Sequence, residues 1–161
     1  MREIIVVAHN IRSTHNVGSI FRTSEGFGVT KIILSGYTPY PEIKNDTRLP
    51  HIREKITAQI HKTALGAEGL VPFEYQPELN LSWLKSNGYR IVGLELDDRA
   101  VDIDDYRPTE KIALLLGEEV EGIDETIRDQ CDDLIEIPMR GKKESFNVSV
   151  ACGITLYQLS K

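Results

Sequence analysis

This sequence of 161 residues lacks any apolar run near the roughly 20 residues that a membrane-spanning helix needs, so we expect a protein in solution. It has two cysteines, Cys131 and Cys152, which form neither a C-x-x-C pair nor a cluster with its histidines. We therefore expect free, buried thiols in a cytoplasmic protein, with no disulfide framework and no metal site.

A surplus of positive charge is also missing. Lys and Arg number 19 against 25 Asp and Glu, which gives a formal net charge of −6. Non-specific coating of nucleic acid depends on Lys and Arg that neutralise phosphates, so this composition argues against it. The acids are concentrated in residues 95–105 and 118–133, whereas Arg140, Lys142 and Lys143 sit together, so a local basic patch remains compatible with the sequence.

The sequence shows no internal repeat, low-complexity segment or linker, so we expect one domain over residues 1–161. Continuous apolar runs at residues 4–8 and 112–116 are typical of strands buried on both faces of a parallel sheet. Alternating strand and helix patterns predict an α/β fold, with a mostly parallel sheet and helices on both faces. Further strands are expected at 31–34, 71–75, 90–96 and 134–137, and helices at 16–27, 51–64, 77–88, 123–131 and 147–160.

The last predicted helix, residues 147–160, contains no charged residue. A helix without a polar face is usually buried on all sides, whereas a terminal helix in a domain of this size normally shows one side to water. We therefore expect more protein to cover it, most simply a partner subunit.

The first candidate site is N-V-G-S-I-F-R-T, residues 16–23, after the first predicted strand. Backbone N–H groups at the start of a helix favour phosphate or carboxylate, and Arg22 could reach the same anion. The alternative is that Asn16 only caps the helix and Arg22 is a surface charge. The nearby Gly26 and Gly28 are not a dinucleotide fingerprint, because no third glycine follows and the pair ends a helix.

The second candidate is L-G-E-E-V-E-G, residues 116–122, directly after the most apolar strand. Its two glycines would let a ligand approach the backbone closely. A carboxylate here could hold a ribose hydroxyl, a hydroxyl-bearing substrate or an arginine of a partner. The alternative is an exposed acidic turn.

The third candidate is I-P-M-R-G-K-K-E-S-F-N-V-S-V-A, residues 137–151. A strand end, a polar loop and a helix follow one another here, which is how open α/β sheets build ligand sites at the carboxyl ends of their strands. We therefore expect this loop to hold a small cofactor. The alternative is a basic surface loop before a helix that is capped by Ser145 or Asn147.

Taken in order, the three stretches resemble the motifs of the SpoU/TrmH RNA ribose methyltransferases of the SPOUT superfamily. The matching patterns are N-x-G-x-x-x-R-T, L-G-x-E-x-x-G and I-P-M-x-G-x-x-x-S-x-N-V-S-V-A, and the resemblance extends from Asn10 to the C-terminus. It implies a deep trefoil knot in which the last helix threads through a loop, an exception to the usual unknotted rule. It also implies a homodimer through the C-terminal helices. Larger members carry a separate RNA-binding domain, which we do not expect in residues 1–161.

The resemblance further implies S-adenosylmethionine as cofactor and methyl transfer to a ribose 2′-hydroxyl of RNA, with tRNA ahead of rRNA. Arg22 would lie near the target phosphate and hydroxyl, Asn16 would organise that loop, and Glu119 would orient one of them. Because a guanidinium stays protonated at any working pH, we expect Arg22 to clamp the phosphate and stabilise developing alkoxide. Ser145 and Asn147 complete the implied catalytic set. The implied cofactor contacts are Leu96, Leu116, Gly117, Gly122, Ile137, Met139, Gly141, Ser145 and Asn147.

RNA would then bind to a narrow patch or through an accessory protein, because the chain is acidic overall. The basic residues expected in this patch are Arg12, Arg22, Arg48, Arg53, Arg140, Lys142 and Lys143. Two alternatives stay open: a non-catalytic knotted module that binds cofactor or RNA, and an ordinary doubly wound nucleotide-binding domain without a knot. The presence of every motif residue that carries chemistry argues against a degenerate, non-catalytic member.

Overall fold

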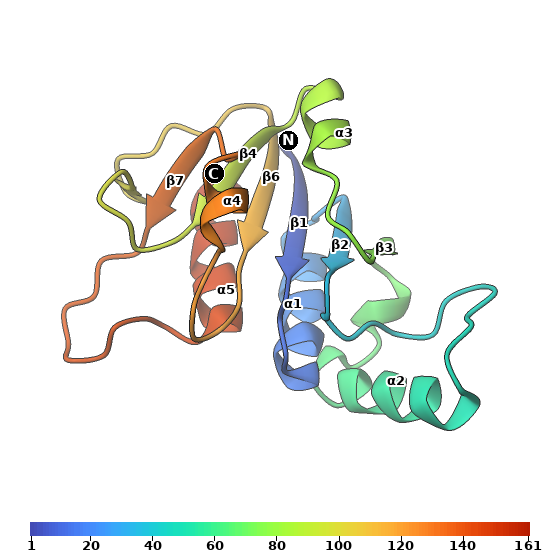
Figure 1. Cartoon of the computed structure of the whole chain (residues 1–161). Helices are drawn as coiled ribbons and strands as arrows, with labels where there is room; N and C mark the ends of the chain where they lie inside the picture. The colour runs from blue at the N-terminus through green and yellow to red at the C-terminus, as the bar shows by residue number, and fades with distance from the viewer.

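The computed structural model describes residues 1–161 and contains one seven-stranded sheet, ordered β3-β2-β1-β6-β4-β7-β5, in which every neighbouring pair is parallel. The strands are β1 (Glu3–His9), β2 (Lys31–Ser35), β3 (Phe73–Gln76), β4 (Arg90–Leu94), β5 (Val101–Asp102), β6 (Lys111–Leu116) and β7 (Asp133–Glu136). The helices are α1 (Thr14–Gly26), α2 (Pro50–Ala64), α3 (Leu81–Ser86), α4 (Glu125–Arg128) and α5 (Val148–Leu159), with a short 3₁₀ helix, η1 (Ala67–Gly69). The predicted α/β fold class is confirmed, whereas the knot stays a prediction (Figure 1).

Strand β1 lies near the middle of the sheet and supplies both halves of the hydrophobic core. Its side chains alternate between the faces: Ile4 and Val6 join the core cluster that contains residues of α1, α2 and α5. Ile5 and Val7 join the second cluster, with residues of α3 and with Ile127 of α4 packed against it. Because both faces are covered, β1 is apolar at all five of its buried positions, residues 4–8, which explains the continuous run in the sequence.

The start of α1 differs from the prediction. The helix begins at Thr14, and Ser13 is its N-cap, with the Ser13 hydroxyl accepting from the backbone N–H of Asn16 at 3.2 Å. Asn16 therefore lies in the first turn, so its predicted role as the N-cap is wrong. This position leaves the Asn16 side chain free for contacts outside the helix.

Two other elements also depart from the expected boundaries. The short strand β5 lies in the acid-rich residues 95–105, beyond the expected strand 90–96, and pairs with β7; two residues are too few to show a periodic pattern. The helix expected over residues 123–131 is reduced to α4, which Asp124 caps by accepting from the backbone N–H of Ile127. Cys131 and Cys152 are free thiols; Cys152 is buried and Cys131 is half-buried. None of the helices has the length and apolar character that would let it cross a bilayer.

Helix α5 is buried on one side only. Cys152, Leu156 and Leu159 are buried against the core, whereas Val150, Ile154 and Tyr157 are exposed. The exposed residues are spaced four and three apart, so they form one apolar stripe along the helix. The inner face of this uncharged helix is thus covered by the core of its own chain, whereas the apolar stripe on its outer face is exposed.

Candidate active site

A cavity of about 220 Å³ opens at the carboxyl ends of β4, β6 and β7. Parallel sheets commonly place their ligand sites at this edge. Six of the predicted cofactor contacts line the cavity: Leu96, Leu116, Gly117, Gly122, Ile137 and Ser145. Met139, Gly141 and Asn147, which were also predicted, are not among the lining residues. Glu119 also lines the cavity, although it was predicted to orient Asn16 or Arg22 and not to hold the cofactor. The other lining residues were not predicted as cofactor contacts: Leu94, Glu95, Glu118, Val120, Glu121, Glu136, Glu144, Phe146, Val148 and Ala151.

In the loop after β6, the glycines Gly117 and Gly122 place backbone without side chains in the wall of this cavity. The backbone groups of Glu118 and Gly122 exchange two hydrogen bonds, of 3.0 and 2.8 Å, which close the loop. A Cβ added at Gly117 would lie 2.5 Å from the carbonyl carbon of Gly122, and Gly122 itself has φ +72°. The carboxylate of Glu95 accepts from the backbone N–H of Ile123 at 2.7 Å and holds the end of the loop. Only glycine fits this turn at residues 117 and 122.

Glu119 connects this loop to the start of α1. Its carboxylate accepts from the backbone N–H groups of Arg12 (3.1 Å to each oxygen) and Ser13 (3.3 Å), and from Nδ2 of Asn16 (3.3 Å). Burial alone would raise the pKa of Glu119, but the hydrogen bonds from Arg12 and Ser13 outweigh it, and the pKa lies below its usual value. Glu119 is therefore ionised and acts only as an acceptor.

Asn147 extends the same network to α5. Its Nδ2 donates to Oδ1 of Asn16 at 3.1 Å, and its Oδ1 accepts from the backbone N–H and the hydroxyl of Ser149, at 2.9 and 2.6 Å. Asn147 is thus the N-cap of α5, one of the two residues expected there. We call these three residues the Asn147–Asn16–Glu119 network. It joins all three candidate stretches beside the cavity.

Arg22 lies apart from this network. It is exposed and makes no hydrogen bond or ion pair within the chain. Arg22 follows Asn16 by six residues, a rise of about 9 Å along α1. Glu119 was expected to orient either Asn16 or Arg22. In the structure it contacts Asn16 and not Arg22. Arg22 is not among the residues that line the cavity of its own chain.

The charge around the cavity is negative. The lining includes six carboxylates and no Lys or Arg: Glu95, Glu118, Glu119, Glu121, Glu136 and Glu144. The first three accept hydrogen bonds from the protein, whereas the side chains of the last three have no partner. Such a cavity favours a ligand with a cationic centre.

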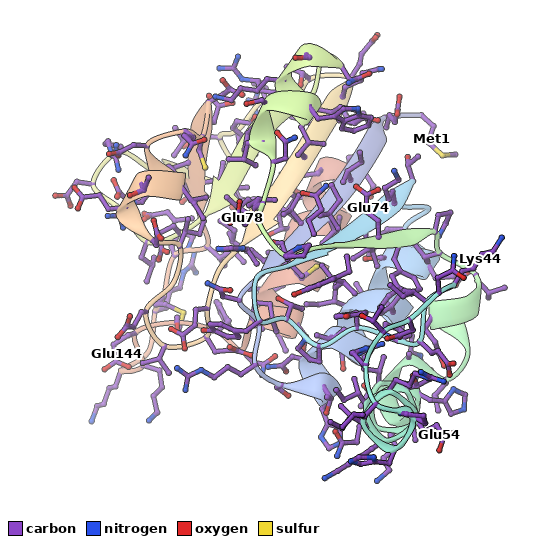
Figure 2. All side chains as sticks on the ribbon, turned by 45° about the vertical axis from the view of Figure 1, so that its right-hand side comes forward. Met1, Lys44, Glu54, Glu74, Glu78 and Glu144 are labelled. Carbon is purple, nitrogen blue, oxygen red and sulfur yellow. The ribbon has the colours of Figure 1, made fainter.

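Five of the seven predicted basic residues fall into two groups. Arg140, Lys142 and Lys143 are exposed in the loop between β7 and α5 and form no ion pair, so they are free to meet an anion. Figure 2 shows Glu144 of the same loop on one side of the molecule, while Lys44 and Glu54 lie on the opposite side. Arg12 lies beside the cavity wall, with its Nε 3.6 Å from Glu118.

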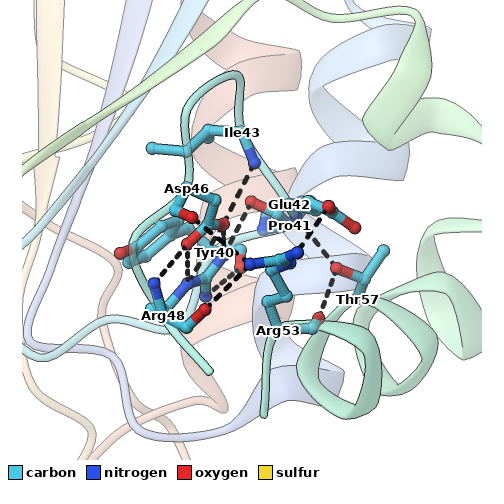
Figure 3. Close-up of polar contacts among 8 residues, drawn as sticks. All are labelled: Tyr40, Pro41, Glu42, Ile43, Asp46, Arg48, Arg53 and Thr57. Atoms are coloured by element: carbon cyan, nitrogen blue, oxygen red, sulfur yellow. Dashed lines mark hydrogen bonds and ion pairs between the residues drawn. The ribbon is translucent and has the colours of Figure 1, made fainter. Parts of the chain in front are cut away.

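Arg48 and Arg53 instead hold the loop of residues 36–50 (Figure 3). The Arg48 guanidinium donates to the carboxylate of Asp46 and to the carbonyls of Tyr40 and Pro41. Arg53 donates to the carbonyls of Asp46 and Arg48, and its Nε lies 3.1 Å from Glu42. These contacts occupy most of the guanidinium N–H groups within the loop, and the predicted RNA contact of both residues stays a prediction. We call Asp46, Arg48 and Arg53 the Asp46–Arg48–Arg53 network.

Comparison with known proteins gives a consistent picture. The model of the SpoU rRNA Methylase family matches residues 3–157. The 23S rRNA (guanosine-2′-O-)-methyltransferase RlmB of Coxiella burnetii is 32% identical over 98% of this chain and 58% of its own length. RlmB of Nitrosomonas europaea is 34% identical over 96% of this chain and 55% of its own. The chain therefore spans less than two thirds of the length of these curated relatives.

Solved structures share the fold. The A. aeolicus TrmH/SpoU tRNA modifying enzyme superposes with a TM-score of 0.80 at 26% identity, covering 99% of this chain and 75% of that one. The AdoMet-bound rRNA methyltransferase of Sinorhizobium meliloti gives a TM-score of 0.80 at 24% identity, covering 98% of this chain and 55% of that one. The sheet order and the covering helices are thus those of known methyltransferases.

Proposed function

We propose that this chain transfers a methyl group from S-adenosylmethionine to a ribose 2′-hydroxyl of RNA. The premise is that the chain belongs to the SpoU rRNA Methylase family. The observation that carries the proposal is the Asn147–Asn16–Glu119 network. Its two contacts, Asn16 to Glu119 and Asn16 to Asn147, each span more than a hundred residues, and Glu119 lines the cavity. Long-range polar contacts that converge on a cavity are the usual mark of a functional site.

The cavity lining fits S-adenosylmethionine. Leu94, Leu116 and Ile137 offer apolar surface, and the closed turn from Gly117 to Gly122 presents backbone that no larger residue allows. The unpartnered carboxylates of Glu121, Glu136 and Glu144 complement a sulfonium and an ammonium group. When bound, the cofactor supplies a methyl group on a positively charged sulfur. We propose that Leu96, Leu116, Gly117, Gly122, Ile137 and Ser145 hold it, together with Phe146 and Val148.

The network positions the RNA instead of accepting its proton. Glu119 already accepts from three residues, so little of its carboxylate is left for a substrate hydroxyl. Its role is to fix the Asn16 amide and the backbone of residues 12–13. Asn147 fixes the other end of the same amide and begins α5 at the correct point. Alignment of the attacking oxygen with the methyl group is the main demand of this reaction, and a rigid network meets it.

We propose a homodimer in which Arg22 of one subunit serves the cavity of the other. The exposed apolar stripe of Val150, Ile154 and Tyr157 supports α5 as the interface. Arg22 is free, charged and remote from its own cavity, which supports a role across that interface. Its guanidinium would clamp the RNA phosphate and stabilise the developing alkoxide while the phosphate or water takes the proton.

The proposed substrate is ribosomal RNA, which reverses the preference for tRNA drawn from the sequence. The curated relatives named above act on 23S rRNA, and this supports the change. We propose that residues 1–161 form one methyltransferase domain of the cytoplasm that binds RNA through Arg12, Arg140, Lys142 and Lys143. An accessory protein would add to this patch if the domain alone binds weakly.

Two measurements test the function. Calorimetry with S-adenosylmethionine should give one site per chain, and absence of binding would sink the proposal. Incubation with labelled cofactor and separated 23S, 16S and tRNA fractions should label ribosomal RNA, with 2′-O-methyl nucleosides after digestion. Binding without labelling of any fraction would instead support the non-catalytic module. Asn16→Ala is the matched negative control, because it removes the centre of the network.

A subunit complementation experiment tests the dimer. Arg22→Ala and Asn16→Ala chains should each be inactive as homodimers. A heterodimer of the two should recover up to half of the activity, because one of its cavities has both an intact Asn16 and an intact Arg22 from the other subunit. No recovery would contradict service across the interface.

A further inference from the structure

Two tyrosines of the loop 36–50 have different environments. The Tyr40 ring stacks on Tyr75 with 3.9 Å between ring centres and lies under Arg48, whose guanidinium carbon is 3.6 Å from the ring centre. The Tyr37 side chain is 52% exposed, and only Arg12 lies over its ring, at 5.8 Å. Tyr40 is thus part of the packed loop, whereas about half of the surface of Tyr37 is open to solvent.

The backbone that presents Tyr37 is fixed on both sides. The N–H of Tyr37 donates to Oδ1 of Asn10 at 3.1 Å, and the carbonyl of Gly36 accepts from the hydroxyl of Tyr75 at 2.6 Å. The buried hydroxyl of Thr38 donates to the carbonyl of Ala8 at 2.9 Å. Asn10 and Gly36 both have positive φ, +56° and +64°, and a Cβ on Gly36 would collide with the Asn10 side chain. Hydrogen bonds thus hold the backbone on both sides of Tyr37, while the residue itself stays exposed.

Tyr37 also lies next to the candidate active site. Arg12, the residue over its ring, approaches Glu118 at 3.6 Å and donates its backbone N–H to Glu119. Glu118 and Glu119 both line the cavity. One side chain therefore separates the exposed ring from the cavity wall.

We propose that Tyr37 is a nucleobase-stacking residue, on which a base of the RNA strand at or beside the target ribose packs, with Arg12 beside it for the strand's phosphate. This inference rests on the proposed function. Single-stranded RNA is bound mainly by stacking of bases on aromatic rings and Arg planes, with basic side chains along the backbone. A ring whose backbone is already fixed loses little conformational entropy when a base binds. Exposed Tyr and Arg also occur in protein interfaces, but the adjoining cavity favours RNA.

The chain provides a matched control in Trp83. Its side chain is 45% exposed and also lies under a cation, with Nζ of Lys31 5.5 Å from the ring. Lys31 is the first residue of β2, whereas Tyr37 follows the end of the same strand, so the two aromatic–cation pairs lie at opposite edges of the sheet. Trp83→Ala removes an exposed ring without touching the candidate site.

The experiment compares Tyr37→Ala, Tyr37→Phe and Trp83→Ala with the wild type. Fluorescence anisotropy measures binding of a labelled, mixed-sequence single-stranded RNA and of an abasic ribose-phosphate strand of the same length. Tyr37→Ala should weaken RNA binding by about 5- to 100-fold, the range for one lost stacking contact. It should leave binding of the abasic strand unchanged. Tyr37→Phe and Trp83→Ala should bind both strands like the wild type.

Two results would overturn the inference. One is RNA binding by Tyr37→Ala equal to that by Trp83→Ala. The other is equal weakening of binding to RNA and to the abasic strand.

Methyl transfer to ribosomal RNA separates this inference from the proposed function. Stacking on a non-reacting base contributes equally before and in the transition state, so Tyr37→Ala should raise KM and leave kcat near the wild-type value. A wild type that transfers methyl normally while Tyr37→Ala has an unchanged KM would refute Tyr37 alone. A wild type that does not bind S-adenosylmethionine would refute the proposed function, while the anisotropy comparison still decides on Tyr37.

Discussion

Two polar networks lie beyond the strand ends, and they are built in opposite ways. The Asp46–Arg48–Arg53 network pairs cations with an anion inside one loop and the start of α2, between residues that are close in sequence. The Asn147–Asn16–Glu119 network has one carboxylate and no cation, and its contacts span 103 and 131 residues. The first network satisfies itself and does not line the candidate active-site cavity, whereas the second reaches the cavity wall at Glu119. We infer that the first keeps the shape of a loop and the second aligns a reaction.

Among the variants that compare the two networks here, Glu119→Gln should have the largest effect. The new amide would set an NH₂ group against the backbone N–H of Arg12, which now donates to both carboxylate oxygens. We expect methyl transfer to fall about 100-fold, because small displacements of an aligned site are costly. The free energy of unfolding should fall by only about 1–2 kcal/mol.

Single-turnover transfer with saturating cofactor and RNA, and urea unfolding, would measure the two effects of Glu119→Gln. Glu125→Gln, an exposed carboxylate of α4 outside the cavity, is the control and should match the wild type. Transfer by Glu119→Gln within threefold of the wild type would remove the contrast between the networks.

Asn147→Asp separates capping from alignment. The remaining Oδ1 still accepts from Ser149 and caps α5, but the donor to Asn16 is lost. We expect about tenfold slower transfer with an unchanged melting temperature, since Asp caps helices as well as Asn does. Asn147→Ala should slow transfer similarly and also cost about 1 kcal/mol of stability. Equal stabilities of the two variants would show that the cap is unimportant.

Asp46→Asn should affect stability and leave activity intact. We expect the melting temperature to fall by about 3–6 °C, while transfer at 25 °C stays within about twofold of the wild type. The hydrogen bonds from Arg48 hold the pKa of Asp46 well below its usual range. A carboxyl with a lowered folded pKa contributes stability above its unfolded pKa, and this contribution disappears as pH falls.

The difference in melting temperature between the wild type and Asp46→Asn should therefore be constant near neutral pH and shrink below about pH 4. Thermal unfolding followed by circular dichroism from neutral to acid pH checks this. Asp98→Asn, an exposed carboxylate without a partner, should show no such difference. A pH-independent difference would mean that the Arg48 contact does not act through the charge of Asp46.

The smallest effect is expected from the basic loop. Replacing Arg140, Lys142 and Lys143 together by Ala should weaken RNA binding about threefold near physiological salt and reduce its salt dependence, by about 0.7 in slope for each lost contact to a single strand. Stability should stay within about 0.5 kcal/mol of the wild type. Arg48→Ala, by contrast, should lower stability and leave the salt slope unchanged. An unchanged slope in the triple variant would assign the basic loop to solvated surface.

Most of the fold could be predicted from the sequence because burial on both faces gives the central strands continuous apolar runs. β1 and β6 end within one residue of their predicted limits. The start of α1 could not be predicted, because Ser13 and Asn16 are both good capping residues. A tertiary contact to Glu119 decides between them. The strand β5 gives no local signal, since its two residues depend wholly on pairing with β7.

The candidate site was predictable where backbone geometry requires a residue type. Gly117 and Gly122 are such positions, and both line the cavity. Side chains that reach the cavity from the long loop, such as Phe146, carry no comparable signal, because the path of that loop is set by contacts far along the chain. The different environments of Tyr37 and Tyr40 could not be predicted either. Both are tyrosines of the same loop, and only the packing of Tyr40 against Tyr75 and Arg48 distinguishes them.

The central place of β1 has a consequence for the order of folding during synthesis. Its first partner, β2, follows within thirty residues, but its second partner, β6, pairs Lys111 with Glu3. Until the ribosome has released β6, one edge of a strand with five consecutive apolar residues, 4–8, stays unpaired, and such edges are templates for association with other chains. Newly made chains therefore pass through a long interval in which slower elongation or higher temperature favours aggregation over completion of the sheet.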